Sequence, residues 1–338
     1  MRDLPALWSS PQWQADLQGW LVPALAAAGL TPTGPVVQDR VRFWSTVLHV
    51  ETDAGRVWVK QNAPSQAFEA ALAEVVHARV PGVVATPLAV SAERGLLASA
   101  DLGPPLWDDD VPPVRDWVEV LGAWARCQVA LAEHGAEVLA AGVPRFPEPA
   151  DAVLAWVGEV LAWLAGLPED DPRRATDEDC AVIDAGLHRI ADAADLLAGG
   201  VVPPSLQHND LHLGNAMRRP DGGFAVIDLG DALWAHPLTS ARIPLWVLRH
   251  RLGSGPGELA AAEAAYLAPW ADVADPAALR RLLPEAERIS CLHRAESWRR
   301  LQADVPVSVV DEDYVHAVVE WLRIAAAEDP YAEATGGS

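Results

Sequence analysis

Two short segments carry most of the side chains that could do chemistry. The first, HNDLHLGN at residues 208–215, places Asp210 five residues before Asn215. The second, IDLGD at residues 227–231, supplies Asp228 and Asp231. The chain has only three asparagines, so composition alone does not account for the His-x-Asp-x4-Asn spacing. Carboxylate and amide oxygens are hard ligands that suit Mg²⁺, and phosphate oxygens can complete its coordination.

A hairpin is expected to bring these two segments together. The sequence PDGG is a turn signal between NAMRR and FAVID. A turn centred between Asp221 and Gly222 would place Met217 opposite Val226. The same register puts Asn215 opposite Asp228, with Cβ atoms about 5 Å apart. Asp210 would then lie in a loop beside this pair.

A lysine is the third candidate. Lys60, in VWVKQ, is the only lysine among 25 Lys and Arg residues, so the site needs a compact ammonium rather than a guanidinium. Two glutamates on the helix expected from Gln66 to Val80 could hold it. Helical geometry places Glu69 about 70° from the centre of the apolar arc and Glu74 about 150° away. We therefore favour Glu69 and keep Glu74 as the alternative.

These motifs resemble those of the aminoglycoside phosphotransferase family of protein-kinase-like small-molecule kinases, over about residues 35 to 237. HNDLHLGN looks like the family's catalytic loop, IDLGD like its metal-binding segment and VWVK like its nucleotide-binding strand. The resemblance implies that Asp210 accepts the proton of a substrate hydroxyl. It also implies that Lys60 and Glu69 bind ATP, or GTP, and that Asn215 and Asp228 hold Mg²⁺.

The nucleotide-binding part departs from the usual pattern. No GxGxxG or Walker A motif occurs, and residues 35–54 contain no glycine. A phosphate-covering loop would have to use RFWST, with Ser45 and backbone amides. The purine edge is expected to meet backbone groups between Ala98 and Asp101, so Ala98 and Ala100 are candidate nucleotide-binding positions.

The elements around these residues predict an α+β fold with two lobes. Residues 1–102 would form the nucleotide-binding lobe, with a leading helix at 12–29 and a sheet plus one main helix at 35–100. VRFWSTVLHVE and GRVWVKQ are the clearest strands. Residues 103–338 would form a larger, mostly helical lobe that carries the catalytic loop 208–215 and the metal-binding segment 227–231.

Composition limits the partners. Hydrophobic residues make up 51% of the 338, and 47 acidic against 25 basic residues give a net charge of −22. This charge argues against nucleic acid or an anionic membrane as a partner and favours a cationic small molecule. Three widely spaced cysteines indicate reduced thiols, and we read neither a secretory signal nor a transmembrane segment, so a cytoplasmic location is expected. No protein partner can be deduced.

The acceptor is expected to be a small-molecule hydroxyl: an amino sugar, an aminoglycoside-like antibiotic, a sugar or an amino alcohol. Its site should lie near Asp231, Trp234, Arg294, Glu296 and Trp298. Two other functions stay open. HNDLH with Asp228 and Asp231 could form a transition-metal hydrolase site, or the chain could be a nucleotide-binding module without catalytic activity.

Overall fold

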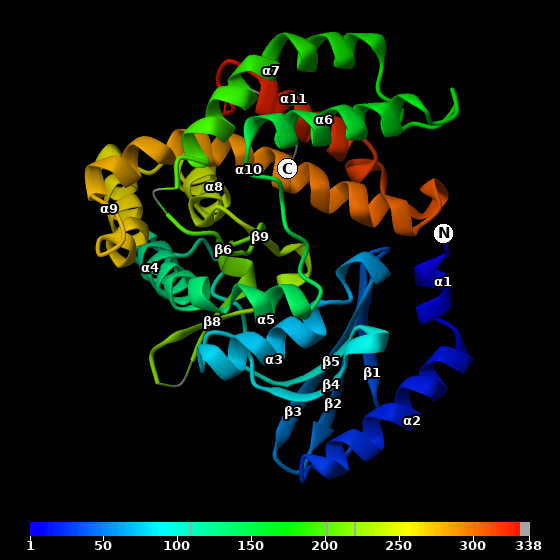
Figure 1. The fold of residues 1–338 in the computed structure, drawn as a ribbon. Coiled ribbons are helices and arrows are strands. Elements are labelled where there is room, and N and C mark those ends of the chain that lie inside the picture. The colour runs from blue at the N-terminus through cyan, green and yellow to red at the C-terminus, as the bar shows by residue number, and fades with distance from the viewer. Residues whose placement is uncertain (109, 201, 220, 332–338) are drawn as a thin grey trace.

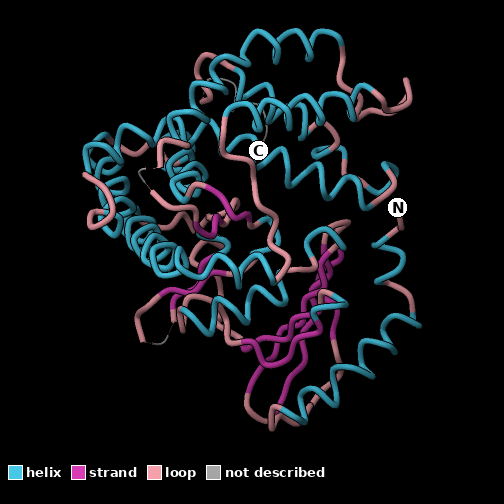
Figure 2. Tube along the Cα trace, viewed as in Figure 1, coloured by secondary structure: helices cyan, strands magenta, loops and turns pink. Residues whose placement is uncertain are grey.

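The computed structural model describes residues 1–331 except 109, 201 and 220. It has a small lobe built on an antiparallel sheet and a larger, mostly helical lobe, which Figure 1 shows one above the other. The predicted α+β architecture is confirmed. Figure 2 separates the two by colour, because the long strands gather in one lobe and only short strands interrupt the helices of the other. The boundary after residue 102 stays a prediction.

The small lobe contains five strands in the order β1-β2-β3-β5-β4. Their bounds are β1 Val37–Val41, β2 Ser45–Thr52, β3 Gly55–Asn62, β4 Pro87–Ser91 and β5 Leu96–Ala100. The helices of this lobe are α1 Leu4–Trp8, α2 Pro11–Ala27 and α3 Glu69–Arg79. The helix expected from residue 66 thus begins three residues later, after a single 3-10 turn at Pro64–Gln66.

The two faces of this sheet have different neighbours. Alternation along β2 and β3 turns apolar side chains such as Val50 and Val57 toward α2, which contributes Leu17, Leu21 and Leu25 at helical spacing to the same core. Lys60 stands opposite Val47 and therefore on the other face. The leading helix covers the outer face of the sheet, and the lysine points toward the large lobe, where it reaches Asp228.

The large lobe contains the remaining helices and four short strands. The helices are α4 Val114–Leu131, α5 Gly135–Ala140, α6 Ala150–Ala165, α7 Asp177–Leu197, α8 Arg242–Trp246, α9 Pro256–Leu267, α10 Pro276–Asp304 and α11 Ala317–Ala326. The strands are β6 Ser205–Gln207, β7 Ala216–Arg218, β8 Phe224–Val226 and β9 Leu233–Ala235, which pair as β6 with β9 and β7 with β8.

The register of the β7–β8 hairpin differs from the prediction by one residue. Val226 pairs with Ala216 instead of Met217, and the N–H of Ile227 donates to the carbonyl of Asn215. The cause is an odd-numbered loop: Arg219 pairs with Gly223, and Gly222 takes a left-handed φ of 84°. The hairpin is thus centred on a residue rather than between two. Pro220 of the predicted turn lies outside the described residues.

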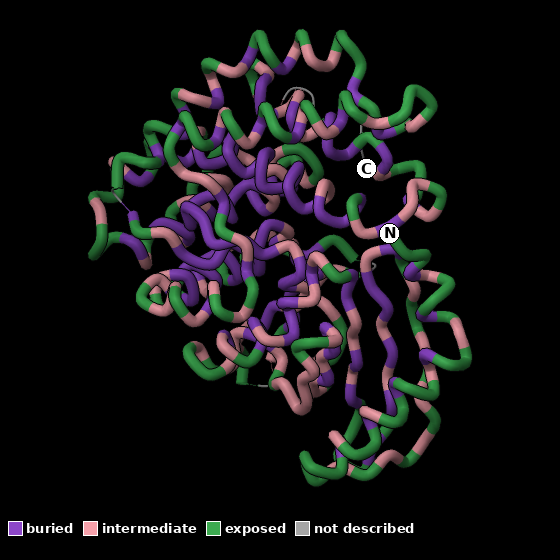
Figure 3. The backbone as a smooth tube through the Cα atoms, turned by 45° about the vertical axis from the view of Figure 1, so that its right-hand side comes forward, coloured by how far each residue is buried: buried purple, intermediate pink, exposed green. Residues whose placement is uncertain are grey.

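Helix α10 joins the two lobes. It is 29 residues long, and Figure 3 shows its buried turns running through the large lobe toward the sheet. Its end contributes Leu301 to the core of the small lobe, together with Val305 that follows it. The backbone carbonyl of Asp304 also accepts a hydrogen bond from Arg2 at 3.2 Å. The sheet is therefore fixed to the large lobe by a helix far along the chain as well as by the segment after β5.

Candidate active site

Lys60 lies at the centre of a cluster of acids contributed by both lobes. Its Nζ is 2.7 Å from Oε2 of Glu69 on α3 and 2.6 Å from Oδ1 of Asp228, which follows β8. Burial by itself would lower the pKa of Lys60, but the two carboxylates outweigh that effect and raise the pKa above its ordinary value. The ammonium is therefore charged and positioned at the cleft.

Glu69 is the lysine partner in the structure, whereas Glu74 is exposed. The Glu69 carboxylate also accepts hydrogen bonds from the side-chain amide of Asn62 and, at 3.0 Å, from the backbone N–H of Leu229. The Glu69 side chain is 7% exposed. One carboxylate thus connects β3, α3 and the segment that carries Asp228, so Lys60 and Asp228 are fixed relative to each other.

Asp210 lies in a second ionic cluster on the large lobe. Its carboxylate is 3.4 Å from Nη1 of Arg294 on α10 and 3.6 Å from Nε2 of His212. The same guanidinium nitrogen is 3.0 Å from Asp231. Burial raises the pKa of Asp210, but Arg294 and His212 outweigh it and hold the pKa below its usual range. Asp210 is therefore an ionised carboxylate able to accept a hydrogen bond from a hydroxyl.

The pKa values of Asp228 and Asp231, the other two carboxylates, shift in opposite directions. Burial opposes ionisation of Asp228, but Lys60 lowers its pKa below the ordinary value. Burial, aided by the charges of Asp210 and Asp228, raises the pKa of Asp231 in spite of Arg294. Asp228 is thus the carboxylate best suited to hold a cation beside Lys60.

The backbone of the catalytic loop is held by groups that the sequence did not single out. Asn209 and Asp228 are the two non-glycine residues with positive φ in the described chain, at 67° and 65°, a conformation that Asn and Asp tolerate better than most residues. The amide of Asn209 donates to the carbonyl of His293 at 2.9 Å and to the hydroxyl of Ser297 at 2.8 Å. These two bonds attach the loop to α10.

His208 is fully engaged within the loop. Its Nδ1 accepts the N–H of Asp210 at 3.3 Å, and its Nε2 is 3.0 Å from the carbonyl of Ile227. Burial lowers its pKa to about 4, so the ring is neutral. Because both ring nitrogens are committed, His208 has no lone pair for a metal. The described residues contain no group of three or more His, Cys, Asp or Glu arranged to hold a metal ion. His208 is therefore not available as the first metal ligand that the transition-metal hydrolase interpretation requires.

The donor set fits a magnesium ion. Asn215 commits its amide nitrogen to the backbone carbonyl of Asp210 at 3.0 Å, and its Oδ1 accepts no hydrogen bond from the described residues. The Asp228 carboxylate is 35% exposed, with one oxygen bound to Lys60. An amide oxygen and an ionised carboxylate are hard oxygen ligands of the kind that Mg²⁺ takes when phosphate completes its shell. The residues present therefore suit the cation.

The sheet contains three of the predicted nucleotide-binding positions, Ser45, Ala98 and Ala100, and their surroundings differ. Ser45 stands opposite Asn62, on the same face as Lys60, directly after the turn between β1 and β2. Ala98 lies between β3 and β4, so both sides of its backbone face a neighbouring strand, and its side chain is buried in the core on the far face. The N–H of Ala100 already donates to the carbonyl of Thr86 at 3.1 Å.

Ala98 and Ala100 therefore stay predicted nucleotide-binding positions, with the backbone of Ala98 and the N–H of Ala100 already engaged in sheet pairing. Trp58 lies on the same face of β3 as Lys60, and its indole N–H donates to Asp101 at 2.9 Å.

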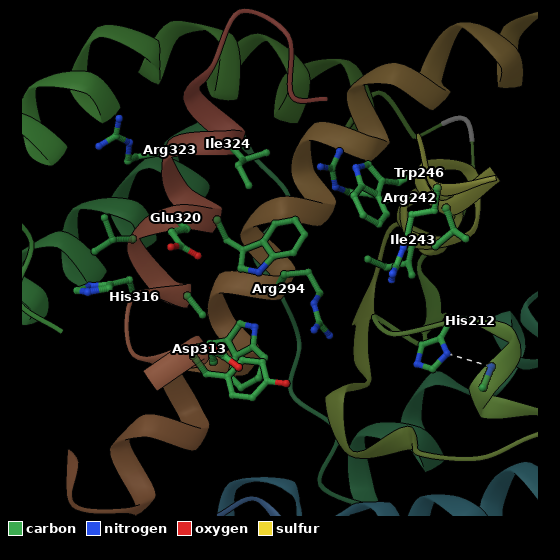
Figure 4. Close-up of a pocket in the computed structure, with 18 of the residues that line it drawn as sticks. His212, Arg242, Ile243, Trp246, Arg294, Asp313, His316, Glu320, Arg323 and Ile324 are labelled. Carbon is green, nitrogen blue, oxygen red and sulfur yellow. Dashed lines mark hydrogen bonds between the residues drawn. The ribbon is translucent and has the colours of Figure 1, made fainter. Parts of the chain in front are cut away.

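A cavity of about 900 Å³ opens beside the catalytic loop (Figure 4). Its lining includes His212, Arg294 and Trp298, and it extends along α8 and α11. Arg294 and Trp298 were expected near the acceptor. Trp234, Glu296 and Asp231, which were expected near the acceptor too, are not among the residues that line this cavity. Trp234 is buried in β9, Glu296 is paired with Arg299 at 2.7 Å and Asp231 with Arg294 at 3.0 Å.

A family model described as "Phosphotransferase enzyme family" matches residues 42–282. The chain belongs to this family. The match spans the lysine strand, the catalytic loop and the Asp228 segment, so the resemblance seen in the motifs is confirmed at the level of the family. Small-molecule phosphotransferases and kinases share the fold.

Solved structures of the same fold include a macrolide 2'-phosphotransferase from Brachybacterium faecium, with 17% identity, a TM-score of 0.54, and coverage of 83% of this chain and 97% of that one. An ethanolamine kinase from Plasmodium vivax is 12% identical, with a TM-score of 0.59 and coverage of 94% and 86%. These identities establish the fold alone. No curated protein sequence matches the chain.

Two further findings concern the chain as a whole. None of the described helices combines the length and the apolar character needed to cross a lipid bilayer. Cys127, Cys180 and Cys291 are all unpaired.

Sequence reasoning missed several residues of this site. Gln66 donates to Asp231 at 2.6 Å, and the cavity is bordered by Arg242, Trp246 and Trp321. The motif spacing gives no signal for these residues, which come from a 3-10 turn and from α8 and α11. Arg294 was expected near the acceptor, but its ion pair with Asp210, 84 positions earlier in the chain, was not.

Proposed function

We propose that the protein transfers the γ-phosphoryl group of ATP or GTP to a hydroxyl of a small molecule, as a phosphotransferase with an alcohol acceptor. The observation that carries this proposal is the joint placement of two clusters. Lys60, Glu69 and Asp228 form one, and Asp210 with Asn215 forms the other. His208 accepts the N–H of Asp210 and contacts the carbonyl of Ile227, whose N–H donates to Asn215, so the two clusters are held next to each other.

Each residue has one part in the reaction. Lys60 binds phosphate oxygens through its ammonium, and Glu69 holds it in place. Asp210 accepts a hydrogen bond from the acceptor hydroxyl and orients its oxygen toward the γ-phosphorus. As the new P–O bond forms, the bond from the γ-phosphorus to the bridging oxygen breaks, the nucleoside diphosphate leaves and the hydroxyl proton passes to Asp210.

Asn215 and Asp228 would hold Mg²⁺, which neutralises phosphate charge when bound. Ser45 and the backbone of the turn between β1 and β2 would cover the phosphates. Arg294 balances the charge of Asp210 and keeps it ionised. Catalysis in this scheme comes from positioning and charge neutralisation, without a covalent intermediate on the enzyme.

The test is detection of a phosphorylated product by mass spectrometry. The purified protein is incubated with Mg-ATP or Mg-GTP and a mixture of hydroxylated small molecules: sugars, sugar acids, amino sugars and amino alcohols. A mass gain of one phosphoryl group that requires the protein and the nucleotide is expected. Tight nucleotide binding with no phosphorylation of any acceptor would instead favour a nucleotide-binding module without catalytic activity.

A further inference from the structure

The acidic and basic residues that line the cavity beside the catalytic loop differ in burial. Its acidic lining residues Asp108, Asp313 and Glu320 are exposed. Asp179, the fourth, is ion-paired with Arg323 at 2.8 Å. The buried cations of the lining are Arg242 and Arg294, and Figure 4 shows Arg242 on the opposite side of the cavity from Glu320. Arg294 is paired with Asp210 and Asp231, so the buried cation without a described acidic partner is Arg242, although the chain carries a large net negative charge.

Arg242 is the most buried of these cations. It is 1% exposed, and among the described residues it forms no ion pair. Its Nη2 donates to the carbonyl of Pro330 at 3.0 Å, and its guanidinium lies 5.5 Å from the ring centre of Trp321. Glu287 is also buried; burial raises its pKa to about 7, and its carboxylate lies 3.8 Å from Arg249. Among the described residues, the buried guanidinium of Arg242 thus has no carboxylate within ion-pair distance.

Among the lining residues, the buried polar atoms without a described partner are all hydrogen-bond donors: Nε and Nη1 of Arg242, Nε1 of Trp246 and Nε of Arg294. Arg242 and Trp246 are four residues apart on α8, so their side chains lie on the same face of the helix. An ammonium group, which only donates, could satisfy none of these atoms, whereas a carboxylate could accept from several.

We infer that the acceptor of this enzyme is a hydroxylated carboxylate, whose anionic end binds at Arg242 and Trp246 while its hydroxyl lies at Asp210. The inference rests on the proposed phosphotransferase function and narrows its substrate class. The indole rings of Trp246, Trp298 and Trp321 also line the cavity and provide flat faces for the body of the substrate. Amino sugars and amino alcohols would place a cation against the buried arginines, at a cost in binding.

Two matched pairs of compounds test this substrate class. Glucuronate is compared with glucosamine, and 6-hydroxyhexanoate with 6-aminohexanol, so that members of a pair share a hydroxylated body and differ in charge. Binding is measured at millimolar concentration by calorimetry on the protein saturated with Mg-ADP. We expect the carboxylate of at least one pair to bind at least about tenfold more tightly than the amine.

Preferential binding of the amines would overturn the inference. So would a lack of binding by all four compounds while Mg-ADP still binds. In the first case, phosphorylation of an amine by Mg-ATP would leave the phosphotransferase function standing. If the protein binds neither Mg-ADP nor Mg-ATP, the proposed function itself fails. The failures of the two proposals are thus distinguishable.

Trp246→Phe keeps the ring and removes one donor, so it tests the site with little risk to folding. The expected result is about tenfold weaker binding of the carboxylate, with unchanged Mg-ADP affinity. Trp270→Phe is the matched control, because Trp270 is buried with an unpaired indole N–H but lies outside the cavity. Equal carboxylate affinity in both variants would contradict a role for the Trp246 donor. Arg242→Met is expected to remove the preference for carboxylate over amine.

Discussion

Replacing Glu69 by glutamine removes one negative charge from the Lys60 cluster without changing the size of the side chain. In the structure, Glu69 binds Lys60 at 2.7 Å and Leu229 at 3.0 Å. Removing one partner of a buried ion pair costs about 3–5 kcal/mol, but Lys60 keeps Asp228 at 2.6 Å and the new amide oxygen can still accept a hydrogen bond. We therefore expect the free energy of unfolding to fall by about 2 kcal/mol.

Glu74→Gln is the matched control, because Glu74 lies on the same helix and is exposed. Its effect on the free energy of unfolding should stay within about 0.5 kcal/mol. Both variants are measured by urea denaturation at neutral pH, followed by titration with Mg-ATP. Glu69→Gln should also weaken nucleotide binding, since Lys60 loses its fixed position. Equal stability and equal nucleotide affinity in the two variants would refute the assignment of Glu69.

Three further predictions concern charge. Arg294→Met removes the cation that lowers the pKa of Asp210, so the acidic limb of the pH–activity profile should move to higher pH; an unmoved limb would show that Arg294 does not control this carboxylate. Buried histidines should make the fold acid-sensitive: burial lowers the pKa of three of them below 6.5, to about 4, 4 and 3 for His208, His236 and His293. Between about pH 6.5 and pH 4, these histidines are neutral in the folded protein but protonated in the unfolded chain. The free energy of unfolding should therefore fall as pH drops through this range, by up to about 1.4 kcal/mol per pH unit for each histidine. Constant stability in urea denaturation over that range would contradict this. Removal of divalent cations with EDTA should stop phosphoryl transfer and added Mg²⁺ should restore it, whereas activity that survives EDTA would contradict the roles of Asn215 and Asp228.

Local patterns were sufficient for the β2–β3 hairpin of the small lobe and for the partner of Lys60. Helical periodicity placed Glu69 toward the interior and Glu74 toward solvent, and the structure has the same arrangement. Alternation along β2 and β3 is equally local, and in the structure it places Lys60 on the face opposite Val50 and Val57. These inferences depend on neighbours within one turn of helix or one pair of strands, where geometry is fixed by the backbone.

The hairpin register could not be obtained in the same way. A turn sequence predicts that the chain reverses, but the loop length depends on which residue takes the left-handed conformation, here Gly222. Because the register differs by one residue, Val226 pairs with Ala216 instead of the predicted Met217. The availability of backbone groups at Ala98 was equally hidden, because it depends on β4 and β3 flanking the strand on both sides.

The proposed acceptor site was the least predictable part. The expectation of a cationic substrate came from net charge, and a total says nothing about where the charges lie. In the structure, Arg242 is buried, and Glu320, one of the exposed acids of the cavity, lies on the opposite side from it. Arg294 reaches Asp210 from α10, and only the tertiary packing of that helix brings the two together.

The most direct test of the central claim is to compare Asp210→Asn with the wild-type protein in both nucleotide affinity and phosphoryl transfer. Asparagine keeps the shape of the side chain, and Arg294 retains Asp231 at 3.0 Å, so the fold should persist. The account predicts nearly unchanged affinity for Mg-ATP and a fall in turnover of about 100-fold or more. Turnover equal to that of the wild type would contradict the role of Asp210 and, with it, the proposed mechanism.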